Sequence, residues 1–383
     1  MVFFVFQLKA QVIDENQVKF ERGILFLDSQ DYTPAIEIFR DLYQITNAPR
    51  VKLEWARASY LSGDLVEAEK LFKEVLTENP PMMVREKIGV FLEEISLSKG
   101  KIEASVGFVM DTNPRAVTNN RIINLYGQSY KYDPGFDTSS QLGIGYNLVG
   151  ALALDRDKRL LFGFGINGAK FEDYIFDRTS IQEYAIYRLF DSPQIKLKTN
   201  YEQFYYGGNL LYTAPSISVL HGKDFSTGAY WINEIKLSKL DYPDYSYLSG
   251  PLNSITTSYG YPVISNGTLG FELGLDRATA NESPYSFRTQ TFGLVGNLFM
   301  PDVFLKVSLK LVAANRVFDD YDPVFGVIRQ DKKRGVYLSL LKTDWKIYGV
   351  APSLDIGYEV NDSNIDLYTY TRNIIGLNLK KVY

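Results

Sequence analysis

The hydrophobic period of this chain changes once, near residue 100, and this change constrains what the chain can fold into. Between Val84 and Ile95 the apolar residues fall at helical spacing, which places them on one face of a helix. From Lys101 to Met110 apolar and polar residues alternate, as on a β-strand with one apolar face. No long amphipathic helix pattern follows Gly100. The sequence therefore predicts a helical domain of about 100 residues followed by an all-β domain of roughly 280.

The helical part contains two segments with the same spacing of small and aromatic residues. Ala35 and Phe39 recur 33 residues later as Ala68 and Phe72, one residue short of the 34-residue tetratricopeptide (TPR) period. A small residue suits the contact between two antiparallel helices, and an aromatic residue fills the gap between repeats. We expect a TPR-like domain over residues 12–99, with a bare helical hairpin that acts as a spacer as the alternative. Its signature positions are Gly23, Tyr32, Ala35, Phe39, Ala56, Gly63, Ala68, Phe72 and Pro80.

The β part is divided into about fourteen candidate strands, most of them ten residues or longer. That length crosses a bilayer at a tilt and is about twice the usual strand of a soluble protein. Long links at 112–137, 241–251, 277–285, 316–332 and 361–370 alternate with tight turns. An even strand count with long loops on one side is typical of a bacterial outer-membrane barrel. A soluble sandwich, which composition alone would favour, gives no reason for loops to be sorted in this way.

The predicted fold class is therefore α plus membrane β. A short N-terminal TPR-like helical domain precedes an antiparallel transmembrane β-barrel of about 14 strands over residues 100–383. In such a barrel the apolar face of each strand meets lipid and the polar face lines the lumen, where polar groups could hold water, pair across strands or guide a polypeptide. For any single one of them, a solvated part of the barrel wall is the preferred interpretation. The lumen-lining candidates are Lys196, Lys198, Asn200, Glu202, Glu272, Lys306, Ser308, Lys310, Asp355 and Glu359.

The connection pattern also predicts the topology. The helical domain enters the barrel on the short-turn side, which places it in the periplasm of a Gram-negative bacterium. Residues 1–11 resemble a weak or truncated signal segment, or else an N-terminus that packs or stays disordered. A terminal aromatic residue, Tyr383, after an alternating last strand is typical of the signal read by the outer-membrane insertion machinery. That machinery and outer-membrane lipid are therefore expected partners.

The sequence offers little for catalysis, cofactors or metals. It has no cysteine and one histidine, His221, which is expected at the short-turn end of a strand, away from the extracellular rim where outer-membrane hydrolases place their acid and base groups. No acidic cluster has the spacing of a calcium-binding loop. A net charge of −4 gives no electrostatic case for nucleic acid. We therefore predict a protein that is not an enzyme, with no catalytic, cofactor or metal site.

The junction between the two parts resembles a known family. The sequence ENPPMMVREKIGVFLEEISLSKGKIEASVGFVMDTNPR ends its first strand on Asp111-Thr112-Asn113 and is similar to surface lipoprotein assembly modulators (Slam proteins). The resemblance implies a periplasmic TPR domain that recruits cargo and a fourteen-strand barrel that conducts or anchors it. The cargo would be a surface lipoprotein or, in relatives, a secreted protein, moved by the route also called type eleven secretion.

Two other functions stay open at this point. One is a passive or solute-selective outer-membrane pore, a class that includes TPR-plus-barrel exporters of exopolysaccharide, although those usually carry much longer TPR arrays. The other is a structural or adhesion protein whose helical domain docks to peptidoglycan.

Overall fold

The computed structural model describes residues 15–78, 80–133, 139–155, 159–191, 193–345 and 349–381. The chain forms two compact units, Met1–Lys99 and Gly100–Tyr383. The predicted signal segment, residues 1–11, and Tyr383 lie outside the described residues. Within the described residues no helix combines the length and the apolar composition that a membrane span requires.

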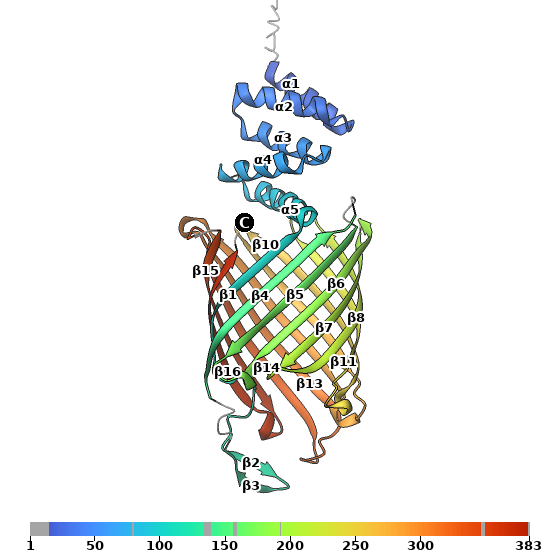
Figure 1. The fold of residues 1–383 in the computed structure, drawn as a ribbon, viewed down its shortest axis with the longest axis vertical. Coiled ribbons are helices and arrows are strands. Elements are labelled where there is room, and N and C mark those ends of the chain that lie inside the picture. The colour runs from blue at the N-terminus through green and yellow to red at the C-terminus, as the bar shows by residue number, and fades with distance from the viewer. Residues whose placement is uncertain are drawn as a thin grey trace, which may run out of the picture. The chain divides into compact units, whose positions relative to one another are not determined.

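The first unit is helical, and its consecutive helices pack on one another (Figure 1). Capping residues explain where the third helix ends and the fourth begins. Gly63, at φ +90°, ends the third helix in the left-handed conformation, and the Asp64 carboxylate then caps the fourth by accepting a hydrogen bond from Glu67 N at 3.1 Å. The helices are α1 (Glu15–Asp28), α2 (Tyr32–Thr46), α3 (Pro49–Ser62), α4 (Leu65–Thr77) and α5 (Met82–Lys99).

The second unit is a closed antiparallel barrel of fourteen strands over the described residues, which confirms the predicted fold class (Figure 1). A small two-stranded sheet, β2 (Ile122–Leu125) and β3 (Gln128–Lys131), lies within the first long link. The barrel strands are β1 (Lys101–Asp111), β4 (Gln141–Ala153), β5 (Leu160–Phe171), β6 (Arg178–Asp191), β7 (Gln194–Tyr206), β8 (Asn209–Asp224), β9 (Tyr230–Leu240), β10 (Gly250–Ile264), β11 (Gly267–Ala278), β12 (Phe287–Met300), β13 (Leu305–Tyr321), β14 (Ile328–Lys342), β15 (Val350–Ser363) and β16 (Tyr370–Lys381).

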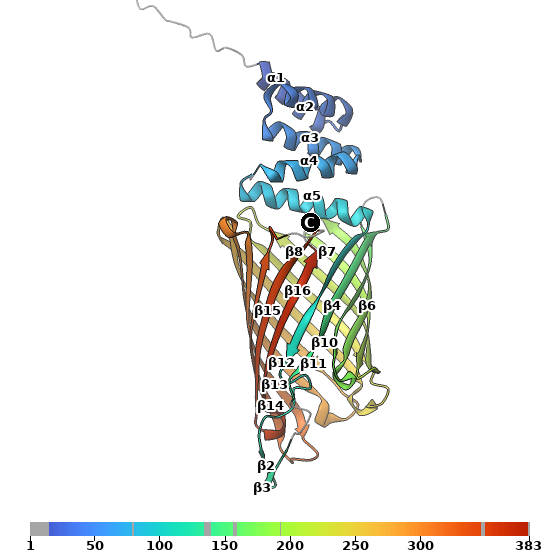
Figure 2. The same cartoon turned by 60° about the vertical axis from the view of Figure 1, so that its left-hand side comes forward.

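The barrel closes where β1 pairs with β16, and we call this contact the closing seam (Figure 2). Its register runs from Ser105↔Lys380 to Asp111↔Ile374. Alternation along the strands separates an apolar outer face from a polar inner face. On the outer face Phe108 is 63% exposed and Leu309 is 41% exposed, although both are large apolar side chains. A barrel surface of this kind suits hydrocarbon rather than water.

The links differ between the two ends of the barrel. The end where β1 begins, joined to α5, carries the links 154–159, 192–193, 225–229, 265–266, 301–304 and 343–349. The opposite end, which we call the loop end, carries 112–140, 172–177, 207–208, 241–249, 279–286, 322–327 and 364–369. The three longest links lie at the loop end, as the sequence predicts.

Two details at the loop end differ from the sequence-based prediction. The glycine pair at 207–208 makes a tight turn there. The link expected at 316–332 shrinks to 322–327, because β13 and β14 continue beyond their apolar stretch. Polar cross-strand contacts support this extension, as where Arg277 forms an ion pair with Asp319.

Candidate functional site

The strand register assigns each polar lumen candidate to a face of the barrel wall. Residues paired across an antiparallel ladder share a face, so a residue paired with an inward residue is itself inward. The inward set reaches from the buried Asp111 around the barrel through successive pairs. All ten candidates fall on this face: Lys196, Lys198, Asn200, Glu202, Glu272, Lys306, Ser308, Lys310, Asp355 and Glu359.

Several of these candidates are paired within the wall. Lys310 in β13 forms an ion pair with Glu272 in β11. Ser308 donates a hydrogen bond to Asn297 at 2.8 Å. Such contacts tie neighbouring strands together and leave a polar, mixed-charge surface facing the lumen. Whether any of these residues contacts a substrate stays a prediction.

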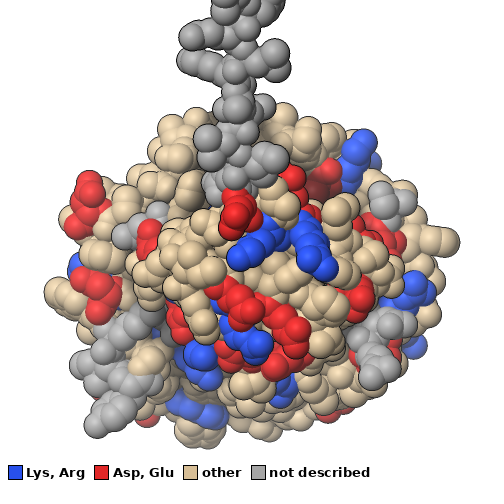
Figure 3. Space-filling model, turned by 90° about the horizontal axis from the view of Figure 1, so that it is seen from above, with Lys and Arg blue, Asp and Glu red and all other residues tan. Residues whose placement is uncertain are grey.

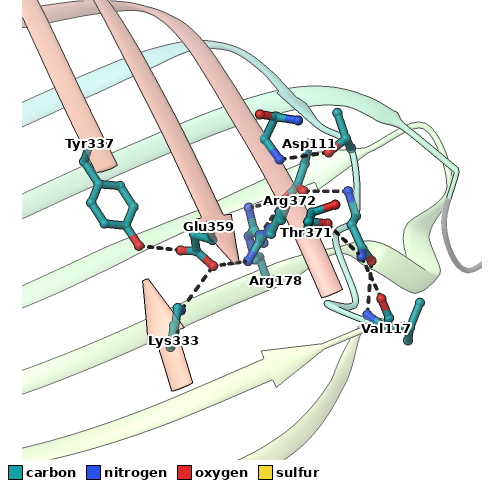
Figure 4. Close-up of polar contacts among 11 residues, drawn as sticks. Asp111, Val117, Arg178, Lys333, Tyr337, Glu359, Thr371 and Arg372 are labelled. Atoms are coloured by element: carbon teal, nitrogen blue, oxygen red, sulfur yellow. Dashed lines mark hydrogen bonds and ion pairs between the residues drawn. The ribbon is translucent and has the colours of Figure 1, made fainter. Parts of the chain in front are cut away.

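The most buried ionic group of the barrel lies at the loop end of the closing seam (Figure 4). The Asp111 side chain, at the end of β1, is 0% exposed. Arg372 in β16 donates from Nε to its Oδ1 at 2.9 Å, and Arg178 in β6 donates from Nη2 to its Oδ2 at 3.1 Å. A carboxylate without water is tolerated only where it is paired in this way, so these two arginines hold Asp111 in its charged form.

Glu359 in β15 extends the group along the interior wall (Figure 4). It accepts a hydrogen bond from the Tyr337 hydroxyl at 2.6 Å and forms an ion pair with Lys333 at 3.1 Å. Its Oε2 also lies 3.9 Å from Nη1 of Arg372. Two carboxylates and three cations therefore form one network, which carries one net positive charge when all are ionised. We call these five residues and Tyr337 the Asp111 cluster.

The motif Asp111-Thr112-Asn113 fastens the first long link to the last strand. Asn113, fully buried, donates from its side chain to the carbonyls of Val117 at 2.8 Å and Thr371 at 3.2 Å. Thr371 N in turn donates to the Asn119 side chain at 2.6 Å. The start of the 112–140 link thus continues the closing seam, and we call these contacts together with the Asp111–Arg372 pair the seam latch.

A second polar group surrounds Asp355 on the interior wall. Its carboxylate accepts hydrogen bonds from Ser339, from Asn378 at 2.7 Å and from Lys380 at 3.0 Å. The group lines an interior cavity of about 670 Å³, together with Ser105 from β1. The Asp355 group supplies donors, acceptors and both signs of charge on one part of the cavity wall, while apolar side chains such as Val109, Phe204 and Ile374 supply most of the rest.

The TPR signature residues occupy the helical core. Ala35, Phe39, Ala56, Ala68 and Phe72 are each 0% exposed. The first two lie in the core cluster of α1 to α3, and the others in the cluster of α3 to α5. This arrangement accounts for their spacing through packing and does not identify a bound partner.

The remaining signature positions are explained by local geometry. A Cβ on Gly23 would lie 2.7 Å from the Phe39 ring, so α1 can approach α2 this closely only with glycine there. Tyr32 packs against the first core cluster. Gly63 ends α3, as described above, and Pro80 precedes α5.

One lysine of α3 makes electrostatic contacts with α2 and with the residue that follows α4. Lys52 on α3 donates to Glu78 at 2.9 Å and lies 4.7 Å from the centre of the Tyr43 ring. Burial lowers the pKa of Lys52, but its interactions with Tyr43 and Glu78 outweigh burial and raise that pKa above its ordinary value. The lysine therefore stays charged and serves as a structural contact between helices.

The charged side chains on the face seen in Figure 3 are of both signs and interspersed. A mixed surface gives no general attraction for a polyanion such as nucleic acid. His221 in β8 forms a hydrogen bond with Asn233 through Nδ1 at 3.2 Å. Over the described residues no group of three or more His, Cys, Asp or Glu side chains could hold a metal ion.

Sequence reasoning did not identify the Asp111 cluster as a unit. Glu359 was a lumen candidate and Asp111 belonged to the junction motif, but Arg178, Lys333, Tyr337 and Arg372 were not singled out. The sequence does contain a signal for these residues, because each lies at an inward position of an alternating strand. An arginine or lysine at such a position faces a closed interior and needs a counter-charge.

The fold and the polar interior together define a class. A closed barrel of fourteen antiparallel strands, with an apolar outer face and a charged interior, is an outer-membrane β-barrel. The family model for the surface lipoprotein assembly modifier matches residues 180–383, more than half of the chain. The chain belongs to this family, which confirms the resemblance seen at the junction. The match begins in β6, so the helical unit and the junction motif lie outside it.

Solved structures with a similar fold are outer-membrane proteins of low sequence identity. The anion-selective porin from Comamonas acidovorans is 10% identical, with a TM-score of 0.42, and the match covers 74% of this chain and 99% of the porin. OccAB4 from Acinetobacter baumannii is 10% identical, with a TM-score of 0.41, covering 74% and 98%. A bacterial polysaccharide outer-membrane secretin is 11% identical, with a TM-score of 0.38, covering 74% and 98%. No curated protein matches the sequence.

Proposed function

We propose that this chain is an outer-membrane translocation factor that delivers a lipoprotein to the cell surface. The observation that carries the proposal is membership of the surface lipoprotein assembly modifier family, through a match that covers β6 to the end of the barrel. In this proposal the helical unit lies in the periplasm and recruits the lipoprotein. The barrel then conducts the cargo outward or anchors it during transfer.

Three features of the chain support this proposal. The helical unit is joined to the barrel at the end with the shorter links, the end that faces the periplasm in outer-membrane barrels. Stacked helical repeats bind peptides and small folded domains, and their short array here suits a short segment of the cargo. The interior cavity offers donors, acceptors and both signs of charge, which suit a polypeptide backbone.

Expression of an epitope-tagged lipoprotein beside this chain tests the recruitment step. With the full chain, the tag should become accessible to antibody and protease on intact cells. With residues 12–98 deleted, the barrel should still insert, but the lipoprotein should stay in the periplasm. Surface exposure that is unchanged by this deletion would contradict recruitment by the helical unit.

The alternative function, a passive or solute-selective pore, predicts a different result. Purified chain in planar bilayers would then show steady ion conductance without any cargo, and lipoprotein exposure would not depend on this chain. That pair of results would overturn the translocation proposal in favour of the pore.

A further inference from the structure

A groove on the outer face of the barrel lies over β11 to β15, which are neighbours in the barrel wall (Figure 2). Two adjoining hollows form it, with volumes of about 850 Å³ and 660 Å³, and both are lined by Phe292, Ala313 and Arg334. Ala313 lies opposite Phe292 on one side and opposite Arg334 on the other. A small residue between two large ones forms the floor, so the two hollows are continuous. We call them together the outer groove.

The strand register shows that the outer groove faces away from the lumen. Lys333 of β14 belongs to the Asp111 cluster and points inward. Successive side chains of a strand point to opposite faces, so its neighbours Lys332 and Arg334 point outward. Their register partners on β13, Asn315 and Ala313, share that face.

The two ends of the outer groove differ in chemistry. The hollow farther from the loop end is lined mainly by outward apolar and aromatic side chains, among them Leu294, Leu311, Val336, Tyr358 and Val360. The hollow nearer the loop end adds two charged side chains and two amides, which belong to Lys332, Asp362, Gln290 and Asn315. The outer groove is therefore apolar at one end and charged at the other.

The charged edge of the outer groove, together with the adjacent ends of β11 to β13, carries more cations than carboxylates. Its outward charged residues are Arg277, Arg288, Lys332, Arg334, Asp319 and Asp362. Each carboxylate forms an ion pair with one arginine, Asp319 with Arg277 and Asp362 with Arg334. Lys332 forms no ion pair among the described residues. Arg288 lies directly opposite Arg277 in the register, where like charges repel. Four cations and two carboxylates leave two positive charges for an external anion.

The position along β13 places this charged edge at the depth of lipid headgroups. Asn315, the register partner of Lys332, lies six positions beyond Leu309. Six residues of a strand cover about 20 Å, which at a tilt of about 40° is roughly 15 Å along the membrane normal, or half the hydrocarbon thickness. With Leu309 near the midplane, Lys332 lies at the level of lipid phosphates and the apolar hollow lies within hydrocarbon.

We propose that the outer groove binds an anionic phosphorylated lipid with several acyl chains. Lys332 and Arg334 are two positions apart on one face of β14, about 7 Å, so a phosphate between them accepts hydrogen bonds from both. The acyl chains occupy the hollow over Ala313 and Leu311. A basic site beside an apolar surface is the arrangement that recognises lipids of this class. This binding holds the barrel among its lipids, so it goes beyond the proposed function and does not depend on it.

Native mass spectrometry of the full chain in detergent tests the requirement for phosphate. The probes are bisphosphorylated lipid A, the same lipid after removal of its phosphates, and phosphatidylethanolamine, whose headgroup has no net charge. We expect the chain to retain lipid A under conditions that release the other two lipids. Equal retention of the phosphorylated and dephosphorylated lipid would overturn the proposal.

Two charge variants test the basic edge. Lys332→Gln with Arg334→Gln should lower the affinity for lipid A by about 30-fold, from the contribution of two basic residues near a membrane surface. Lys223→Gln with Lys342→Gln is the matched control, because it removes two outward cations at the opposite end of the barrel. Its affinity should be unchanged. Equal loss of lipid A in the two variants would contradict a defined site.

Two filling variants test the apolar hollow. Ala313→Trp fills the floor of the outer groove. Val106→Trp fills another hollow of the outer face, of about 430 Å³, whose described lining residues include no charged side chain. Every variant should stay heat-modifiable. Ala313→Trp should weaken the retention of lipid A and Val106→Trp should not; equal retention in the two variants would overturn the proposal.

The same spectra report the oligomeric state. A wild-type dimer that Ala313→Trp converts to a monomer would assign the outer groove to a second copy of the chain and overturn the lipid proposal. None of these measurements uses a cargo, so each contrary result leaves the proposed function intact.

Discussion

Asp111 has a fully buried carboxylate whose charge is balanced by Arg372 and Arg178. Replacing it by asparagine keeps the shape but removes the counter-ion that both guanidinium groups share, leaving Arg372 only the more distant Glu359 carboxylate. Loss of one partner from a buried ion pair costs about 3–5 kcal/mol. We expect Asp111→Asn to lower the free energy of unfolding of the barrel by about that amount, measured by urea unfolding in lipid vesicles.

Asp362 provides the control for this prediction. It also pairs with an arginine, Arg334, but both side chains are about half exposed or more, at 48% and 67%. An exposed pair contributes about 0–1 kcal/mol, so Asp362→Asn should have a small effect. Equal losses of unfolding free energy in the two variants would show that burial does not determine how much the Asp111 ion pairs stabilise the barrel.

The two faces of β13 give a prediction from adjacent residues. Leu309 lies on the outer face, while Lys310 points inward to Glu272. Leu309→Arg should destabilise the inserted barrel by about 2–4 kcal/mol if this position lies near the bilayer midplane. Lys310→Arg should be nearly neutral, because it keeps the charge and the inward direction. Folding from urea into vesicles measures both, and similar behaviour of the two variants would contradict the facing of the strand.

At the scale of elements, one carboxylate joins α4 to α5. The hydrogen bonds from Lys73, at 2.6 Å, and from Lys99 lower the pKa of Glu69. A lowered pKa in the folded state means that the contribution of Glu69 is present above its unfolded pKa and is lost as pH falls through the folded pKa. We expect hydrogen-exchange protection factors of α4 and α5 to fall in this acid range in the intact chain.

The Glu69→Gln variant should lack this acid-dependent loss and should match the wild type at the lowest pH. Glu67→Gln is the control, since Glu67 lies on the same helix and pairs with Lys70 of that helix, at 3.4 Å, rather than with α5. It should retain the acid-dependent loss. A pH profile of Glu69→Gln that matched the wild type throughout would show that this contact does not stabilise the two helices.

The two units have separate cores, and this predicts independent folding of the barrel. The helical cores contain residues of α1 to α5, whereas the barrel is closed by its own strands. A truncated chain that begins at Lys99 should insert into vesicles and migrate as a heat-modifiable barrel on gels. Failure to insert would mean that the helical unit takes part in barrel folding.

The elements could be predicted from sequence because their signals are local. The period of two along β13 distinguishes Leu309 from Lys310 without any knowledge of neighbouring strands. The end of β13 could not be predicted in this way, because its last residues are held by partners such as Arg277 rather than by an apolar face. The β2–β3 hairpin was also missed, because its turn residues Tyr126 and Gly127, which both have positive φ, lack the Asn-Gly or Asp-Gly pair that marks such a turn in a sequence.

The Asp111 cluster could not be predicted because its contacts depend on closure of the barrel. Asp111 and Arg372 are 261 positions apart in the chain and meet only because β1 pairs with β16. The motif at Asp111-Thr112-Asn113 marked the right place. Its role in the seam latch required knowledge of the last strand.

At the scale of the whole molecule, an apolar exterior fixes the barrel in the membrane and a polar interior gives a polypeptide a surface that hydrocarbon cannot offer. The latch closes the loop end of the seam. In the proposed function, a lipoprotein passes to the cell surface with its polypeptide in contact with this polar interior.

Transfer of a lipoprotein across a vesicle membrane tests the central claim most directly. A labelled lipoprotein is enclosed in vesicles with or without the purified chain, and its accessibility to external protease is measured over time. The account predicts that the lipoprotein becomes accessible only in vesicles that contain the chain, while an enclosed dye is retained. A lipoprotein that stays protected in vesicles with correctly folded chain, accompanied by steady leakage of the dye, would contradict the account and identify a pore.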